Sequence, residues 1–146
     1  MEEFCLGLYV AGLDYSLPRG IIPADTKFEV ALVGGEYWLV DEVLTPDSSR
    51  YWDVGVWKEA QKRYESPEGF DKQYARNWGL EVATPFDVTG IKALKPANLA
   101  HCQWVGELPL PDEVVLKTTG LYRGIVPRLT DMTLWEFWTH RMGIAA

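Results

Sequence analysis

The sequence predicts an α+β fold with a small antiparallel sheet and packed helices. Two runs rich in β-branched and aromatic residues, 27–33 and 37–43, flank a short glycine-containing segment and indicate a β-hairpin. Apolar residues recur at helical spacing in residues 2–15, and a proline followed by two acidic residues marks another helix start at position 111. With 146 residues, of which 47% are apolar, the chain fits one domain with a hydrophobic core.

The first half of the chain predicts helices on both sides of the hairpin. Residues 2–15 form an amphipathic helix that Pro18 ends. Residues 45–55 contain a proline and several short polar side chains, so we expect a polar loop there. Residues 56–64 and 70–79 follow as two helices.

The second half predicts two further helices after an irregular stretch. Prolines and glycines interrupt residues 82–109, which therefore predict no regular element. The helix that opens at Pro111 is expected to close at Pro127. Thr133 and Glu136 have the spacing of a capping box and start the last helix.

Composition excludes several classes of protein. Fourteen basic against 21 acidic side chains give a net charge of −7, which is unsuited to general nucleic-acid binding. Two cysteines make neither a disulfide framework nor a metal site. No apolar run approaches the ~20 residues of a membrane span, and the acidic start MEEF is unlike a signal peptide. We therefore expect a cytoplasmic protein without nucleic-acid or membrane partners.

The hairpin brings two carboxylates together in the predicted register. A three-residue loop at 34–36 pairs Val33 with Tyr37, and this register sets Glu29 across from Asp41. Opposed Cβ atoms lie about 5 Å apart, where like charges destabilise a sheet. A divalent cation, the nearby Lys27 or a shared proton would compensate. The alternative is a pair of strand-end carboxylates in solvent, since a slip of one residue separates them.

Familiar catalytic motifs are absent from the sequence. It contains no glycine-rich phosphate loop, and its two histidines lie in no motif that suggests a catalytic triad. Three polar clusters remain, and Lys27, Arg50 and Lys72 from these clusters could together hold a phosphate. Surface ion pairing is the alternative explanation for each.

Three blocks that include these clusters occur in a fixed order. They are RGIIPADTKFE at 19–29, VDEVLTPDSSRYW at 40–52 and FDKQYARNW at 70–78. The blocks resemble signatures of the SAICAR synthetase (phosphoribosylaminoimidazole-succinocarboxamide synthase) family. LPLPDEVV at 108–115, followed by Thr118 and Tyr122, is similar to the C-terminal helix of that family. The resemblance covers most of 8–80 and 108–129 and concerns only the C-terminal half of the family.

The resemblance implies a chemistry and a set of site residues. It implies an ATP-dependent ligase that activates a carboxylate on an aminoimidazole ribonucleotide and joins it to the amine of aspartate. Asp25 and Lys27 would be catalytic, and Glu29 and Asp41 would bind Mg²⁺ near the phosphates of ATP. The positions implied to contact the phosphorylated substrate, or to lie near it, are Asp47, Ser49, Arg50, Lys72 and Gln73.

The resemblance also implies how the chain is organised. It predicts a single domain over 1–146 that resembles the C-terminal lobe of the family, with an insertion at 84–106 and an extension at 130–146. The lobe that covers the nucleotide in the family lies outside the resemblance. We therefore expect a homo-oligomer or a partner subunit. We also expect the insertion or the last helix, with its Trp135 and Trp138, to cover the hairpin.

Two other functions are compatible with the sequence. A shortened homologue could keep the ribonucleotide site and catalyse an ATP-independent step in a purine-derived nucleoside antibiotic pathway of the coformycin type. A non-catalytic binding subunit is the second alternative. Retention of Glu29, Asp41 and Arg50 argues against it, because a scaffold needs no opposed carboxylates.

Overall fold

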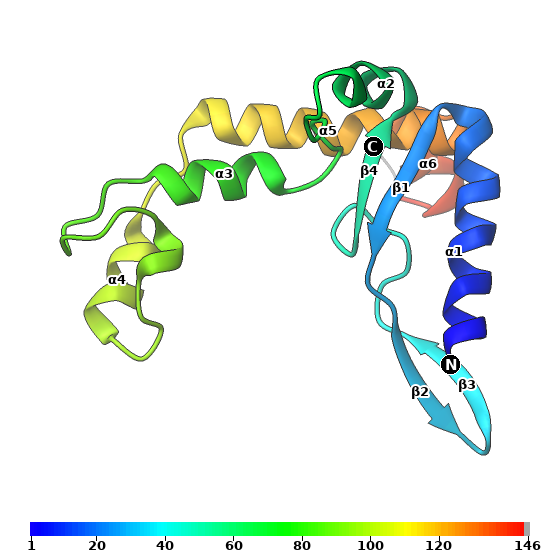
Figure 1. The fold of residues 1–146 in the computed structure, drawn as a ribbon, viewed down its shortest axis with the longest axis horizontal. Coiled ribbons are helices and arrows are strands. Elements are labelled where there is room, and N and C mark those ends of the chain that lie inside the picture. The colour runs from blue at the N-terminus through cyan, green and yellow to red at the C-terminus, as the bar shows by residue number, and fades with distance from the viewer. Residues whose placement is uncertain (145–146) are drawn as a thin grey trace. The chain divides into compact units, whose positions relative to one another are not determined.

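The computed structural model describes residues 1–144 and has an α+β fold, as the sequence predicts (Figure 1). Its helices are α1 (Glu2–Ser16), α2 (Val54–Lys62), α3 (Gln73–Glu81), α4 (Leu99–Glu107), α5 (Asp112–Thr130) and α6 (Leu134–Arg141), with short 3₁₀ turns η1 (Leu17–Arg19) and η2 (Ile91–Ala93). The strands are β1 (Ile21–Thr26), β2 (Glu29–Val33), β3 (Glu36–Val40) and β4 (Ser49–Asp53). Within the described residues no helix is long and apolar enough to cross a membrane.

The chain divides into two compact units. Residues 1–71 and the described residues from 121 onward form the first, and Lys72–Gly120 form the second. The strands therefore all lie in the first unit, together with α1, α2 and α6. The second unit consists of α3, η2, α4 and the first part of α5.

The first unit contains two separate antiparallel strand pairs, where the sequence predicts one small sheet. β1 pairs with β4, and β2 pairs with β3. The β1–β4 pair carries the buried core: Ile21 and Tyr51 pack with Ile125 of α5, and Phe70 and Leu129 pack against this cluster. α1 runs beside β1 (Figure 1), where the Tyr9 hydroxyl donates to the carbonyl of Pro23 at 2.7 Å.

The hairpin is confirmed, but its predicted register is wrong by one residue. Val33 pairs with Glu36 across a two-residue turn, so Glu29 lies opposite Val40 and not opposite Asp41. Gly34 and Gly35 have φ values of 61° and 88°. Two successive residues with positive φ make the tight turn whose twist matches that of the flanking strands, and Gly-Gly favours it over a three-residue loop.

Two further predictions fail in regions rich in proline and short polar residues. The expected loop at 45–55 contains β4, and no strand is predicted for the residues of β1. Pro23 and Asp25 are rare in strands, but Pro23 is tolerated in a two-stranded sheet with an irregularity directly after it. Pairing with β4, which lies more than 20 residues away, decides the conformation of β1.

The helix predictions hold except at two places. Residues 2–15, 56–64 and 70–79 correspond to α1, α2 and α3, and the predicted capping box starts α6. The irregular stretch contains α4, whose Asn98 caps the helix by accepting from the Ala100 amide at 3.0 Å. α5 continues past Pro127, because the amide of Asp131 still bonds the Pro127 carbonyl at 2.9 Å.

An ion pair ties α5 to the end of β4. Arg128 donates to the Asp53 carboxylate at 2.6 Å and to the Gly20 carbonyl at 3.0 Å. Asp53 also caps α2 by accepting from the Val56 amide at 2.9 Å. The bonds from Val56 and Arg128 hold the pKa of Asp53 below its ordinary value. A single carboxylate thus links a strand, a helix start and a distant helix.

We expect Asp53→Asn to lower the free energy of unfolding by about 1 kcal/mol at neutral pH, because the amide keeps the cap and loses the charge facing Arg128. A carboxyl whose pKa is lowered by folding stabilises the fold above its unfolded pKa of about 3.9. The difference in unfolding free energy between wild type and Asp53→Asn should therefore vanish as the pH falls through the lowered pKa of Asp53 in the folded state. Urea unfolding at several pH values measures it.

The matched control is Glu59→Gln, which removes the carboxylate of an exposed pair with Lys62. We expect it to change the unfolding free energy by less than about 0.5 kcal/mol. An equal loss of unfolding free energy in both variants would mean that the Asp53–Arg128 pair stabilises the fold no more than an exposed surface pair.

Candidate functional site

Four of the predicted site residues meet at the open end of the β1–β4 pair. The register sets Asp25 opposite Arg50 and Thr26 opposite Ser49. The Arg50 guanidinium lies 3.4 Å from the Asp25 carboxylate, with both side chains accessible to solvent. Lys27 follows directly, and its amide donates to the carbonyl of Ser48 at 2.9 Å. The pairing therefore brings the first and second sequence blocks together at one edge.

A cluster of hydroxyl groups adjoins Arg50. The Ser49 side chain is buried, and its oxygen lies 2.8 Å from the hydroxyl of Thr26. Thr45 and Ser48 cap each other's backbone: the Ser48 amide donates to the Thr45 hydroxyl at 3.2 Å, and the Thr45 amide donates to the Ser48 hydroxyl at 3.1 Å. The loop before β4 is thus held in one shape by its own short polar side chains.

Tyrosines from outside this loop hold it at two points. The Tyr122 hydroxyl, on α5, donates to the Asp47 carboxylate at 2.7 Å. The hydroxyl of Tyr51 donates to the carbonyl of Leu44, and burial of this side chain raises the pKa of Tyr51 above its ordinary value. Asp47 therefore has a defined position although it lies in a loop.

Three carboxylates act on the charge of Lys27. It forms a close ion pair with Glu29. The hydrogen bond to Glu29 and its charge raise the pKa of Lys27, and the charges of Asp41 and Glu42 raise it further. Asp41 has a φ of 64°, which turns the chain out of β3 directly after the hairpin. Glu29 and Asp41, the two predicted metal ligands, are not cross-strand neighbours. The negative charge of each nevertheless raises the pKa of the Lys27 ammonium group.

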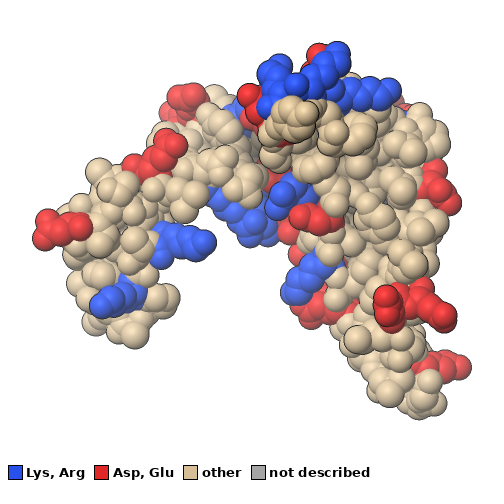
Figure 2. Space-filling view, viewed as in Figure 1, with Lys and Arg blue, Asp and Glu red and all other residues tan. Residues whose placement is uncertain are grey.

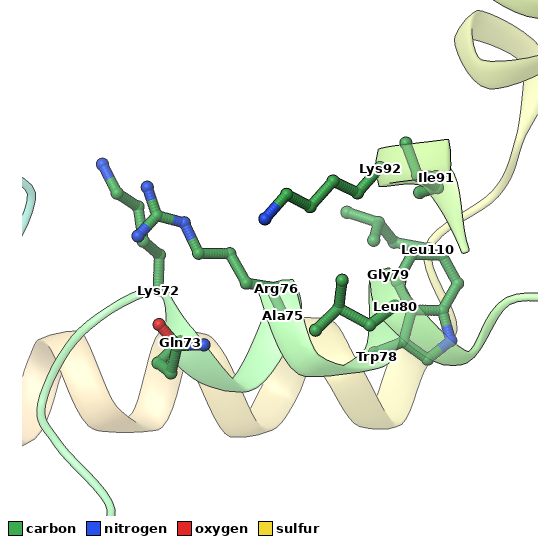
Figure 3. Close-up of a pocket in the computed structure, with 10 residues that line it drawn as sticks. All are labelled: Lys72, Gln73, Ala75, Arg76, Trp78, Gly79, Leu80, Ile91, Lys92 and Leu110. Atoms are coloured by element: carbon green, nitrogen blue, oxygen red, sulfur yellow. The ribbon is translucent and has the colours of Figure 1, made fainter. Parts of the chain in front are cut away.

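Lys72 and Gln73 lie in the second unit, at the start of α3. Gln73 is the first residue of the helix, and its amide donates to Asn77 at 2.7 Å. Both residues line a pocket of about 670 Å³ within this unit, which Figure 3 shows in close-up. The predicted site residues are therefore divided between the two units, seven in the first and two in the second.

Sequence reasoning missed several residues of this site. Thr26 has no predicted role, because its partner Ser49 becomes its neighbour only through the unpredicted strand β1. Thr45 and Glu42 lie within the second block without a predicted role; the Thr45 hydroxyl donates to Glu42 at 2.5 Å. The spacing of Thr45 and Ser48 is a recognisable signal for such a turn. No local signal connects Tyr122 with Asp47.

Comparison with known proteins identifies the family. The family model for SAICAR synthetase matches residues 1–90. The chain belongs to the SAICAR synthetase family. A phosphoribosylaminoimidazole-succinocarboxamide synthase from Maridesulfovibrio salexigens is 46% identical over 134 residues, which are 92% of this chain and 38% of that protein. The synthase of the same name from Leptothrix cholodnii is 40% identical over 131 residues, covering 89% and 39%.

A solved structure shows the same relationship. The SAICAR synthase of Saccharomyces cerevisiae in complex with SAICAR aligns with a TM-score of 0.57 and 32% identity, over 90% of this chain and 37% of the yeast chain. The chain therefore spans less than two fifths of the length of the family members that it matches here. The resemblance inferred from the sequence blocks, and its restriction to one part of the family, are confirmed.

Proposed function

We propose that this chain carries the ribonucleotide and magnesium site of a SAICAR synthetase-like enzyme. The reaction would be the ATP-dependent ligation that the family implies. In this reaction a carboxylate on an aminoimidazole ribonucleotide is activated by phosphoryl transfer and then forms an amide with an amine. The observation that carries the proposal is the convergence of Asp25, Lys27, Ser49 and Arg50 at one end of the β1–β4 pair.

Arg50 would bind the phosphate of the ribonucleotide. Its planar guanidinium can bond two phosphate oxygens at once. The hydroxyls of Ser49 and Thr26 are nearby, because these two residues form the next cross-strand pair after Asp25 and Arg50. Asp25 holds the guanidinium at 3.4 Å and leaves it accessible. Asp47, held by Tyr122, would orient the rest of the substrate. Lys72 and Gln73 of the second unit are also proposed to bind substrate, as the family resemblance implies.

Glu29 and Asp41 would hold Mg²⁺. Residues 1–144 contain no group of three or more acidic, histidine or cysteine side chains placed for a metal. Magnesium requires fewer, since it usually takes one or two carboxylates and completes its shell with water and phosphate oxygens. Glu29 fits this need because it already pairs with a cation, Lys27, and the negative charge of Asp41 acts on the same ammonium group. When bound, the ion would neutralise the phosphates of ATP.

The chain's own residues would perform the remaining steps. Lys27 would lend its positive charge to the transferred phosphoryl group, and Asp25 would steer the position of Arg50. The names of the relatives give no support to the alternative in a nucleoside antibiotic pathway, so we do not propose it.

The first test concerns the phosphate. We expect Arg50→Ala to weaken binding of an aminoimidazole ribonucleotide about ten- to a hundredfold, because a charge-assisted hydrogen bond contributes roughly 1.5–3 kcal/mol. Binding of the corresponding nucleoside, which has no phosphate, should hardly change. Calorimetry on the full chain measures both. Equal losses for both ligands would assign Arg50 a purely structural role.

The second test concerns the metal. We expect Asp41→Asn to abolish the magnesium dependence of ligand binding while the fold stays intact, because it removes one of two carboxylate ligands. The measurement is calorimetry with Mg·ATP and with the ribonucleotide, each with and without Mg²⁺. Glu36→Gln, at the tip of the hairpin, is the matched control and should retain the dependence. Unchanged magnesium dependence in Asp41→Asn would show that the carboxylates are structural.

The third test concerns association. The hairpin carries exposed apolar side chains: Leu32 is 66% exposed and Trp38 is 56% exposed, and the hairpin surface is mostly uncharged in Figure 2. Trp135 of α6 is 50% exposed as well.

We propose that a second copy or a partner polypeptide covers the hairpin with an interface of at least ~1,000 Å². Light scattering at micromolar concentration should detect self-association, which Trp38→Ser should weaken. A strict monomer that also turns over substrate alone would contradict this.

A further inference from the structure

A groove rich in aromatic side chains lies in the first unit, between the end of β4, helix α2 and the segment that follows this helix. Its volume is about 390 Å³, which is within the range of binding sites. We call it the aromatic groove, and it is lined by Trp52, Trp57, Gln61, Tyr64, Glu65, Ser66 and Pro67. None of these is a predicted site residue, so the groove is separate from the candidate site described above.

The backbone at Tyr64 has a conformation that disfavours a tyrosine. α2 ends in a Schellman motif: the Glu65 amide donates to the Ala60 carbonyl at 3.0 Å. The Tyr64 amide donates to the Gln61 carbonyl at 3.2 Å, which completes the motif. Helices usually place glycine at this position, and the φ of Tyr64 is 56°. A bulky side chain at such a φ strains the backbone.

The ring of Tyr64 buries almost no surface within the chain. The residue is 99% exposed, so contacts with the described residues do not offset the backbone strain. Strained residues of this kind cluster at binding sites, where a ligand contact gives the side chain its role. Contact with a partner would supply the burial that the chain itself does not provide.

The edge of β4 beside the groove is already occupied. Trp52 forms a β-bridge with Gly69. The Phe70 amide donates to the Tyr51 carbonyl at 2.9 Å. The segment after α2 therefore covers backbone groups that a partner strand would need. A partner has to bind through the side chains of the groove and not by strand addition.

The side chains of the groove indicate the chemistry of that partner. Trp57 and Gln61 lie four residues apart on α2 and thus on the same helix face. Among the described residues that line the groove, Glu65 alone is charged. Its ion pair with Arg63, at 2.8 Å, is exposed on both sides. Exposed pairs are weak, so the Glu65 carboxylate can also accept a cation of the partner.

We propose that the aromatic groove binds a proline-rich segment of a partner polypeptide, in the polyproline II conformation and with a basic residue at one end. Proline rings pack against the faces of tryptophan and tyrosine, and polyproline II leaves its carbonyls free to accept hydrogen bonds, here from the Gln61 side-chain amide. The basic residue pairs with Glu65, and the net charge of −7 favours a basic partner. The inference does not depend on the proposed function.

Calorimetry on the full chain with synthetic peptides tests the proposal. The probe is an oligoproline peptide of about ten residues, roughly three turns of polyproline helix, with one terminal arginine. We expect it to bind at least about tenfold more tightly than a glycine–serine peptide of the same length with the same arginine, because the preformed helix loses less conformational freedom on binding. Replacing the arginine by glutamate should weaken binding about two- to fivefold. Equal binding of the proline and glycine–serine peptides, or binding of neither at millimolar concentration, would overturn the proposal.

Variants then locate the binding. Tyr64→Gly removes the ring and relieves the backbone, so it should raise the urea concentration at the unfolding midpoint and weaken binding of the oligoproline probe at least about tenfold. Tyr64→Phe keeps the ring and should bind the probe within about threefold of wild type. Unchanged probe binding in Tyr64→Gly would overturn the assignment.

Asp87→Gly is the matched control. Asp87 is exposed, has a φ of 54° and does not line the groove, so this variant should bind the probe like wild type. Equal weakening by Asp87→Gly and Tyr64→Gly would overturn the assignment. Tyr64→Gly should leave magnesium-dependent ribonucleotide binding unchanged, which separates this inference from the proposed function.

Discussion

The pairing of β1 with β4 is the interaction on which the first unit depends. It buries Ile21 and Tyr51 against Ile125 of α5, and these are the side chains of the central core. The same register sets Asp25 beside Arg50 and Thr26 beside Ser49. Stability and site geometry therefore rest on one set of backbone hydrogen bonds. A change that shifts this register would disturb the core and the candidate phosphate site together.

The hairpin β2–β3 depends on this pairing in a different way. It leaves the sheet after Thr26 and returns to it before Ser49, so its carboxylates reach the site through two short connections. The backbone turns at Asp41, and Glu29 pairs with Lys27. The two carboxylates therefore bring negative charge to the end of the β1–β4 pair, where Arg50 provides positive charge. A site with both signs of charge suits a ligand that combines phosphate groups with a cation.

The second unit is organised by a local backbone constraint. Gly90 has a φ of 85°, and a Cβ at this position would lie 2.5 Å from the carbonyl oxygen of Leu80, so glycine permits the close approach of η2 to α3. The family model matches residues 1–90, which include the whole strand region and α3.

The sequence by itself determined most of the helices, the existence of the hairpin and the family. These follow from signals within a few residues of each other: helical spacing, a capping box, two glycines and contiguous motifs. Only the tertiary structure decided strand β1, the hairpin register, the contact of Tyr122 with Asp47 and the pocket lined by Lys72 and Gln73. Each of these depends on partners distant along the chain or on one backbone angle. Local sequence preference does not encode such contacts, because their free energy arises only when the distant segments meet.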